Sequence, residues 1–217
     1  MRSFASHEAL TFAPVHHDPM YLHVKRGIDI LGASIGLVLA SPVMLLAAIA
    51  IKLDSPGPVF FEQIRSGLYG RSFSMYKLRT MVSNAEARRD EIQQLNEMDG
   101  PVFKIRHDPR ITRVGRLLRM FSIDELPQLW SVLSGEMSLV GPRPPIPAEV
   151  RLYETAERRR LSMRPGLTCL WQISGRNDVE FDEWIKLDLQ YIDTWSLWND
   201  VKIVLLTVPV VLGGGGS

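Results

Sequence analysis

The feature that most constrains this chain is an uninterrupted stretch of 22 uncharged residues, from Ile30 to Ile51. As a straight α-helix it would extend roughly 33 Å, which is enough to span the hydrocarbon core of a bilayer. Ser41 and Pro42 stand at its midpoint, where proline removes a backbone donor and clashes with the preceding turn. The sequence therefore predicts a kink or break, leaving two halves that are each too short to cross alone.

Basic residues flank this stretch on both sides. Lys25 and Arg26 precede it and Lys52 follows it, with more basic residues soon after: Arg65, Arg71, Lys77 and Arg79. By the positive-inside rule both flanks are expected on the cytoplasmic side. A re-entrant helix that enters and leaves by one membrane face satisfies this pattern. A kinked helix that does cross, or a buried core helix, remains open as an alternative.

The length of 217 residues fits one medium domain with appendages. We expect an α+β fold that is mostly helical, with a re-entrant membrane helix, a small catalytic domain, a β-hairpin and amphipathic interfacial helices. The expected division is a flexible leader over 1–24, the membrane helix over 25–54, a cytoplasmic catalytic domain over 55–212 and a flexible glycine-rich tail over 213–217.

The charge balance excludes some classes of protein. The net charge of +1, from 25 basic and 24 acidic residues, argues against a globally basic nucleic-acid binder. Between Phe61 and Met120, however, 12 Lys and Arg face 7 Asp and Glu, which suits phosphates or anionic headgroups as well as an ordinary solvated face. Cys169 is the only cysteine, which excludes an intramolecular disulfide framework and suits a reducing cytosol.

Two elements are predicted after the apolar stretch. Residues 59–65 and 72–79 are rich in strand-forming side chains and are joined by a loop with Gly67 and Gly70, which predicts a hairpin. Further on, arginine recurs every third residue beside apolar positions, which predicts an amphipathic basic helix suited to headgroups or substrate phosphates. These arginines are Arg110, Arg113, Arg116 and Arg119.

Asp124 and Glu125 form the sharpest candidate site, because two adjacent carboxylates open a predicted helix close to those arginines. One interpretation is structural: Ser122 and Glu125 form a capping box, and Asp124 complements the helix dipole. The other is catalytic, since a carboxylate there can attack phosphorus while its neighbour holds Mg²⁺. Nearby arginines would then neutralise charge on the transferring group.

Seven ordered motifs resemble the bacterial sugar transferase family of monotopic polyprenyl-phosphate phosphoglycosyl transferases. The resemblance covers the chain from about Lys25 to Leu212. The motifs are Lys25-Arg-Gly-Ile-Asp29, Tyr76-Lys-Leu-Arg-Thr-Met81, Asp108-Pro-Arg-Ile-Thr-Arg-Val-Gly115, Asp124-Glu-Leu-Pro-Gln-Leu-Trp130, Gly135-Glu-Met-Ser-Leu-Val-Gly-Pro-Arg-Pro144, Arg164-Pro-Gly-Leu-Thr168 and Trp171-Gln-Ile-Ser-Gly-Arg-Asn-Asp178.

This resemblance implies a re-entrant helix broken at Ser41-Pro42, and a catalytic dyad at Asp124 and Glu125. Asp124 would attack the diphosphate of a UDP-sugar, release UMP and pass the phosphosugar to undecaprenyl phosphate. Mg²⁺ is the implied cofactor, with Asp124 as the first candidate for its protein ligand and Glu125 as the second candidate. The implied phosphate and nucleotide contacts are Pro142, Arg143, Pro144, Lys77, Arg79, Arg119 and Arg176.

Motif analogy further favours UDP-galactose or UDP-glucose as donor, and the start of an exopolysaccharide repeat as the role. The expected location is the bacterial inner membrane, with the catalytic domain on its cytoplasmic face. A homo-oligomer is compatible with this interpretation, which includes no nucleic-acid partner. Two rivals remain: a phosphohydrolase that uses Asp124 with water as acceptor, and a non-catalytic adaptor whose basic surface binds anionic lipid.

Overall fold

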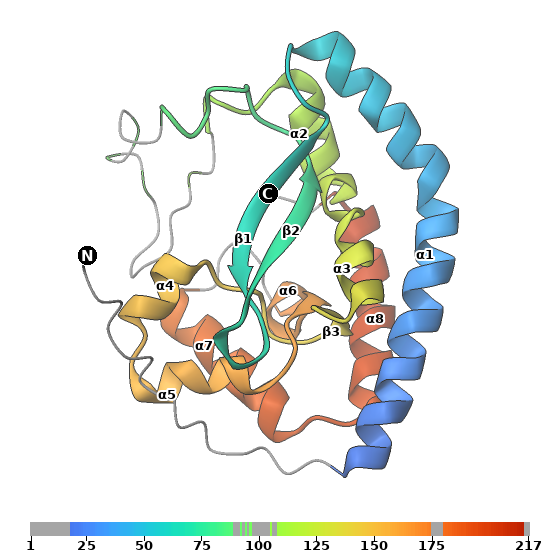
Figure 1. Ribbon diagram of the computed structural model, residues 1–217, viewed down its shortest axis with the longest axis vertical. Helices are drawn as coiled ribbons and strands as arrows, with labels where there is room; N and C mark the ends of the chain where they lie inside the picture. Colours follow the sequence, from blue (N-terminus) through green and yellow to red (C-terminus); the bar gives the residue numbers. More distant parts are fainter. Residues whose placement is uncertain are drawn as a thin grey trace, which may run out of the picture.

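The computed structural model describes residues 18–88, 92, 94, 96, 105, 108–174 and 180–214. This part of the chain is mostly helical and holds two small sheets (Figure 1). The α-helices are α1 (Pro19–Asp54), α2 (Arg113–Met120), α3 (Gln128–Ser134), α4 (Pro147–Leu152), α5 (Thr155–Arg158), α6 (Leu170–Ile173), α7 (Phe181–Asp193) and α8 (Leu197–Leu212). The strands are β1 (Phe60–Ser66), β2 (Ser72–Leu78), β3 (Ser138–Val140) and β4 (Gly166–Thr168), and the 3₁₀ turns are η1 (Leu68–Gly70), η3 (Ile123–Glu125) and η4 (Arg159–Ser162).

The apolar stretch lies in the single long helix α1. Asp18 caps its first turn, because its carboxylate accepts a hydrogen bond from the Met20 amide at 2.9 Å. Pro19 occupies the first turn, where its missing donor costs nothing. Residues 19–24, which the sequence assigned to a flexible leader, are therefore helical.

Of the kink or break predicted at Ser41 and Pro42, the break is wrong, because α1 continues through both residues. Figure 1 shows it bowing along the rest of the chain without folding back on itself. Pro42 cannot donate to the carbonyl of Val38 four residues earlier. The Ser41 hydroxyl donates to that same carbonyl at 2.8 Å, so the acceptor is satisfied and the helix bends instead of ending.

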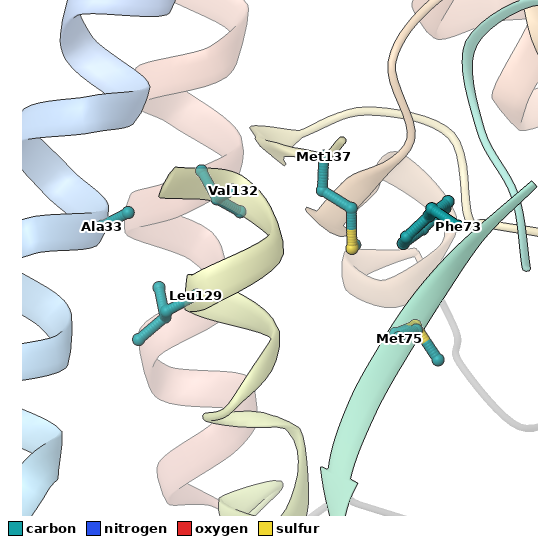
Figure 2. Close-up of a cluster of buried hydrophobic side chains, with 6 residues drawn as sticks. All are labelled: Ala33, Phe73, Met75, Leu129, Val132 and Met137. Atoms are coloured by element: carbon teal, nitrogen blue, oxygen red, sulfur yellow. The ribbon is translucent and has the colours of Figure 1, made fainter. Parts of the chain in front are cut away.

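One face of α1 carries small residues and packs on the domain. Ala33, Ala40 and Ala47 are buried there, and a Cβ on Gly36 would lie 3.1 Å from Leu129 Cδ1. Figure 2 shows the resulting cluster, in which α1 meets α3 and β2 lies on the other side of α3: Ala33, Leu129, Val132, Met137, Phe73 and Met75. Small side chains let the helix backbone approach α3 closely.

The opposite face of α1 exposes large apolar side chains. These include Leu31, Val38, Leu39, Leu45, Leu46 and Leu53. The helix is long and apolar enough to cross a membrane, and only 17% of its most apolar window is buried. The alternative of a buried core helix is therefore wrong, since core helices hide most of such a surface.

Strands β1 and β2 confirm the predicted hairpin. They pair antiparallel, from Phe60 opposite Leu78 to Ser66 opposite Ser72. Alternation along β2 puts Phe73, Met75 and Lys77 on one face of the hairpin. Because Phe73 and Met75 are buried against the domain, Lys77 is directed inward as well.

A basic helix forms as predicted, although it begins at Arg113. The Thr112 hydroxyl caps it by accepting from the Gly115 amide at 3.0 Å, and the Val114 amide donates to Asp54 at the end of α1 at 3.1 Å. Arg110 lies before the helix and forms a buried ion pair with Asp108 at 2.6 Å. The helix α2 is thus fixed to the end of α1.

The second sheet was not predicted. In it β3 and β4 lie parallel, with Ser138 opposite Gly166 and Val140 opposite Thr168. The strands continue into a close contact of two glycines, since a Cβ on Gly166 would lie only 2.0 Å from the Gly141 nitrogen. This contact fixes the start of the loop that holds Arg143.

Asp200 of α8 links the first helix of the chain to the C-terminal helices. Its carboxylate accepts from Lys25 of α1 at 2.6 Å and from the Tyr191 hydroxyl at 2.7 Å. Lys25 and Tyr191 also donate to the Val140 carbonyl, at 3.0 and 3.1 Å. The helix α8 is therefore held beside α1 (Figure 1) and close to the end of β3.

Candidate active site

Asp124 and Glu125 lie in η3, between α2 and α3. The capping-box interpretation is wrong, because the Ser122 side chain makes no cap hydrogen bond. Ser122 instead adopts a left-handed conformation with φ 53°, which is strained for a residue other than glycine. The regular helix α3 begins only at Gln128, so the chain holds the two carboxylates on a tight turn.

The turn is anchored from the apolar side. Ile123 packs against a buried cluster of α1, β2 and α2: Ala47, Ile51, Leu78 and Leu118. The two carboxylates that follow Ile123 are thereby held next to the C-terminal half of α1. Their position relative to the long apolar helix is a property of the core and not of local sequence.

Glu125 forms an ion pair with Lys77. The Lys77 ammonium donates to Glu125 Oε1 at 2.6 Å, and both side chains are half-buried. Burial alone would raise the pKa of Glu125, but the charge and hydrogen bond of Lys77, followed by Arg143 and Arg65, lower it below its usual value. Glu125 is thus held as a carboxylate at neutral pH.

Asp124 has the opposite environment. It is 7% exposed, and burial raises its pKa to about 6, with Glu125 adding to the rise and Lys77 and Arg119 opposing it. Among the hydrogen bonds of the described residues, none brings a side-chain donor to this carboxylate. A desolvated carboxylate that is still largely ionised at neutral pH is suited to nucleophilic attack.

Arg119 reaches the dyad from the last turn of α2. Its Nε donates to the Thr80 hydroxyl at 2.9 Å, and burial lowers its pKa although Asp124 and Asp108 oppose the change. Within the described part of the chain its terminal nitrogens make no hydrogen bond. They are placed to meet an anion beside Asp124.

The loop of Pro142, Arg143 and Pro144 is rigidly held. The Pro142 carbonyl accepts from the Gly166 amide at 2.9 Å, and the Pro144 carbonyl accepts from Arg65 at 2.9 Å. Both prolines are buried, whereas the Arg143 side chain is half-buried and acts on the pKa of Glu125. The structure therefore brings this predicted arginine to the predicted dyad.

Arg65 is a site residue that the sequence analysis used only as a flanking charge. It is buried at the end of β1, and its pKa is lowered to about 9 by burial and by Arg143, with Glu149 and Glu125 opposing. It therefore joins Lys77, Arg119 and Arg143 around the two carboxylates. Gln63, two residues away, accepts from its Nε at 3.0 Å, but the contact with the Pro144 carbonyl and the charges of Arg143 and Glu149 come from the distant 143–149 segment, so no local pattern marks its place.

The remaining predicted contacts lie elsewhere. Arg79 donates to the carbonyls of Ser55 and Pro56, so it holds the chain where α1 ends. Both of its terminal nitrogens are used in these bonds and are not directed at Asp124 or Glu125. Ser41 and Pro42 lie midway along α1. Arg176 lies outside the described residues.

Asp124 and Glu125 suit a hard cation that takes only one or two of its ligands from the protein. In the described part of the chain no group of three or more potential metal ligands gathers, which argues against a closed protein cage there. Mg²⁺ characteristically binds through one or two carboxylates plus substrate phosphates. Buried Asp124 accepts no side-chain hydrogen bond from the described residues, so such an ion would add a direct partner for its charge to the nearby cations Lys77 and Arg119.

Comparison with known proteins agrees with this chemistry. Residues 20–214 match the family model described as bacterial sugar transferase. The galactosyl transferase CpsE of Streptococcus agalactiae is 46% identical over all of this chain and 48% of its own length. The exopolysaccharide production protein ExoY of Rhizobium meliloti is 44% identical over 89% of this chain and 87% of its own.

A third relative is the UDP-glucose:undecaprenyl-phosphate glucose-1-phosphate transferase of Caulobacter vibrioides, 47% identical over 87% of this chain and 69% of its own. The chain thus spans about half the length of CpsE and most of ExoY. The similarity covers the long apolar helix, the dyad and the arginine loop together.

Proposed function

Because the chain belongs to the bacterial sugar transferase family, we propose that it transfers a sugar-1-phosphate from a UDP-sugar to undecaprenyl phosphate and so begins an exopolysaccharide or related glycan. The printed name of the Caulobacter relative gives UDP-glucose and undecaprenyl phosphate, and that of CpsE gives galactosyl transfer. These names support glucose or galactose as the sugar.

The observation that carries the proposal is the buried Asp124 among cations. In the first half-reaction an Asp124 oxygen attacks the sugar-bearing phosphorus of the UDP-sugar. The bond from that phosphorus to the bridging oxygen breaks, and UMP leaves with the electron pair. A pKa of about 6 leaves most of Asp124 ionised at pH 7, and burial removes the water that would weaken it as a nucleophile.

In the second half-reaction a phosphate oxygen of undecaprenyl phosphate attacks the same phosphorus. The bond from Asp124 to phosphorus breaks, which restores the carboxylate and yields the sugar diphospholipid. Arg119 and Arg143 neutralise charge on the transferring group in both steps. Lys77 holds Glu125 ionised, and Mg²⁺ held by Asp124 and Glu125 would neutralise phosphate charge.

We further propose that α1 embeds in the cytoplasmic membrane while both of its ends stay on the cytoplasmic side. Lys25 near its start bonds Asp200, and Asp54 at its end bonds the Val114 amide. Since both ends attach to the same domain, a full crossing would require that domain to straddle the bilayer. The exposed apolar face of a single bent helix would instead enter one leaflet.

Cysteine labelling of sealed vesicles tests this topology. Tyr21 and Leu53 are 51% and 84% exposed, and each replaced singly by cysteine is expected to react from the cytoplasmic side. The native Cys169 is buried and serves as the background control. Labelling of the two positions from opposite sides would show that α1 crosses the membrane.

UMP release tests the reaction. Purified protein with Mg²⁺ and undecaprenyl phosphate is given a panel of UDP-sugars, and the wild type is compared with Asp124→Asn. Release that requires the acceptor, occurs with a glucose or galactose donor and is abolished by the substitution is the expected result. Full release without acceptor would favour a phosphohydrolase. Turnover by Asp124→Asn would exclude Asp124 as the nucleophile.

A further inference from the structure

The Arg143 side chain rests on a residue far away in sequence. Its guanidinium carbon lies 4.7 Å from the centroid of the Trp184 ring on α7, within the range of a cation–π contact. Its Nη1 lies 4.0 Å from Glu149 Oε2, which is long for a hydrogen bond. Because the described residues offer the Arg143 side chain no hydrogen bond, its donors remain available to a ligand.

Trp184 is itself fixed by its neighbours. It is 5% exposed, and its ring centroid lies 4.7 Å from that of Trp171 and 6.3 Å from that of Phe181. Tyr153 and Ile185 complete the same buried cluster. The ring is therefore a rigid surface for a cation and not a side chain that follows the cation.

A second guanidinium near the Trp184 ring, that of Arg160, already has hydrogen-bond partners. The Arg160 guanidinium lies 5.5 Å from the Trp184 centroid, but its Nε donates to Asp188 at 2.8 Å and its Nη1 donates to the Tyr153 hydroxyl at 2.7 Å. Arg160 also donates to the Arg143 carbonyl at 3.4 Å. The Arg160 donors therefore have partners within the protein, and this arginine supports the loop. Of the two arginines beside the Trp184 ring, Arg143 is the one whose side chain is available to bind a phosphate.

We propose that Trp184 is a positioning residue of the donor site, because its indole face holds the Arg143 guanidinium ready for the diphosphate of the UDP-sugar. The inference rests on the proposed transfer from a UDP-sugar. Arginine loses rotamer freedom when it binds a phosphate, and prior ordering lowers that cost. Trp184 acts through Arg143 and touches no reacting atom.

A double-mutant cycle tests this role. The Michaelis constant for the donor and kcat are measured by UMP release for wild type, Trp184→Leu, Arg143→Met and the double variant. Trp184→Leu is expected to raise KM for the donor by about 2- to 30-fold, the range of a cation–π contact, with a smaller change in kcat. The double variant is expected to equal Arg143→Met, since without the cation the ring has nothing to hold.

Two variants separate positioning from packing. Phe181→Leu removes a buried ring from the same cluster without removing the Arg143 contact, so thermal stability should fall while KM rises much less than in Trp184→Leu. Trp184→Phe keeps a weaker aromatic face and should fall between wild type and Trp184→Leu. If Trp184→Leu does not fold, Trp184→Phe replaces it in the double-mutant cycle with Arg143→Met.

The outcomes distinguish the two proposals. An active wild type with additive effects of the Trp184 and Arg143 substitutions would overturn the positioning role alone. Equal KM changes in Phe181→Leu and Trp184→Leu would do the same, because packing would then explain both. A wild type without turnover on any donor would refute the proposed function, and the positioning role would fall with it.

Discussion

Replacing Lys77 by methionine should move the pH profile of the enzyme. Lys77 forms a 2.6 Å ion pair with Glu125, and its charge also opposes the burial that raises the pKa of Asp124 to about 6. The proposed reaction requires the Asp124 carboxylate. Wild-type activity should therefore be lost as the pH falls through about 6, and the substitution should shift that loss to higher pH.

The magnitude follows from the environment of the dyad. A nearby opposite charge lowers the pKa of a carboxyl group by about 1–3 units, and Arg119 would remain the main cation acting on Asp124 in the variant. A rise of about two units would bring the pKa near 8. The ionised fraction at pH 7 would then fall from roughly nine-tenths to one-tenth, so the rate should fall about tenfold.

The assay is kcat/KM for UMP release between pH 5 and 9 at one fixed Mg²⁺ concentration. Lys77→Met should recover most of its lost activity by pH 9, whereas Lys77→Arg, which keeps the charge, should retain a midpoint near that of the wild type. A midpoint unmoved in Lys77→Met would refute the reasoning, and so would a loss of the same factor at every pH, because Lys77 would then act only by binding substrate.

Three further predictions concern stability. Asp124→Asn should abolish turnover yet raise the free energy of unfolding at pH 7 by up to about 3 kcal/mol. The pKa of Asp124 is about 6 in the folded protein against the ordinary 3.8, so its ionisation costs stability progressively as the pH rises from about 4 to 6. Urea unfolding at pH 7 and pH 4 checks this, since most of the gain should be absent at pH 4. Gly166→Ala should cost roughly 3 kcal/mol or more, since its Cβ would lie 2.0 Å from the Gly141 nitrogen, whereas Gly27→Ala, with nothing within 4 Å, should be tolerated in the same melts. Arg79→Met should cost about 2 kcal/mol by leaving two backbone carbonyls without their donors, and it should leave the donor KM unchanged; a raised KM at wild-type stability would place Arg79 in the phosphate site instead.

Local sequence was sufficient to predict secondary structure where the conformation of a residue depends mainly on its neighbours in the chain. The hairpin of β1 and β2 follows from alternation and a glycine-containing turn, and its predicted bounds lie within one residue of the observed strands. The apolar length of α1 was equally plain. Ser41 and Pro42 were interpreted less well, because the Ser41 hydroxyl satisfies the very carbonyl that Pro42 leaves free.

The candidate site shows the same division. The motifs brought attention to Asp124, Glu125 and Arg143 as residue types in order along the chain, and the structure brings these three together. Spacing alone left a capping box open at the dyad, which the left-handed Ser122 and the Lys77 ion pair exclude. The choice between those interpretations depends on Lys77, which lies in β2 and is distant in sequence from the dyad.

The sequence was enough to identify the long apolar helix, the hairpin and the candidate catalytic carboxylates, because periodicity, turn chemistry and motif order can be read along the chain. The chemical behaviour of those carboxylates and their neighbours depends on the folded structure. The pKa of Asp124 depends on burial by a core that includes α1, and Arg65 and Trp184 reach the loop of Arg143 from strands and helices distant in sequence. Desolvation and Coulomb interactions depend on distance in space, and a linear sequence does not contain those distances until the chain has folded.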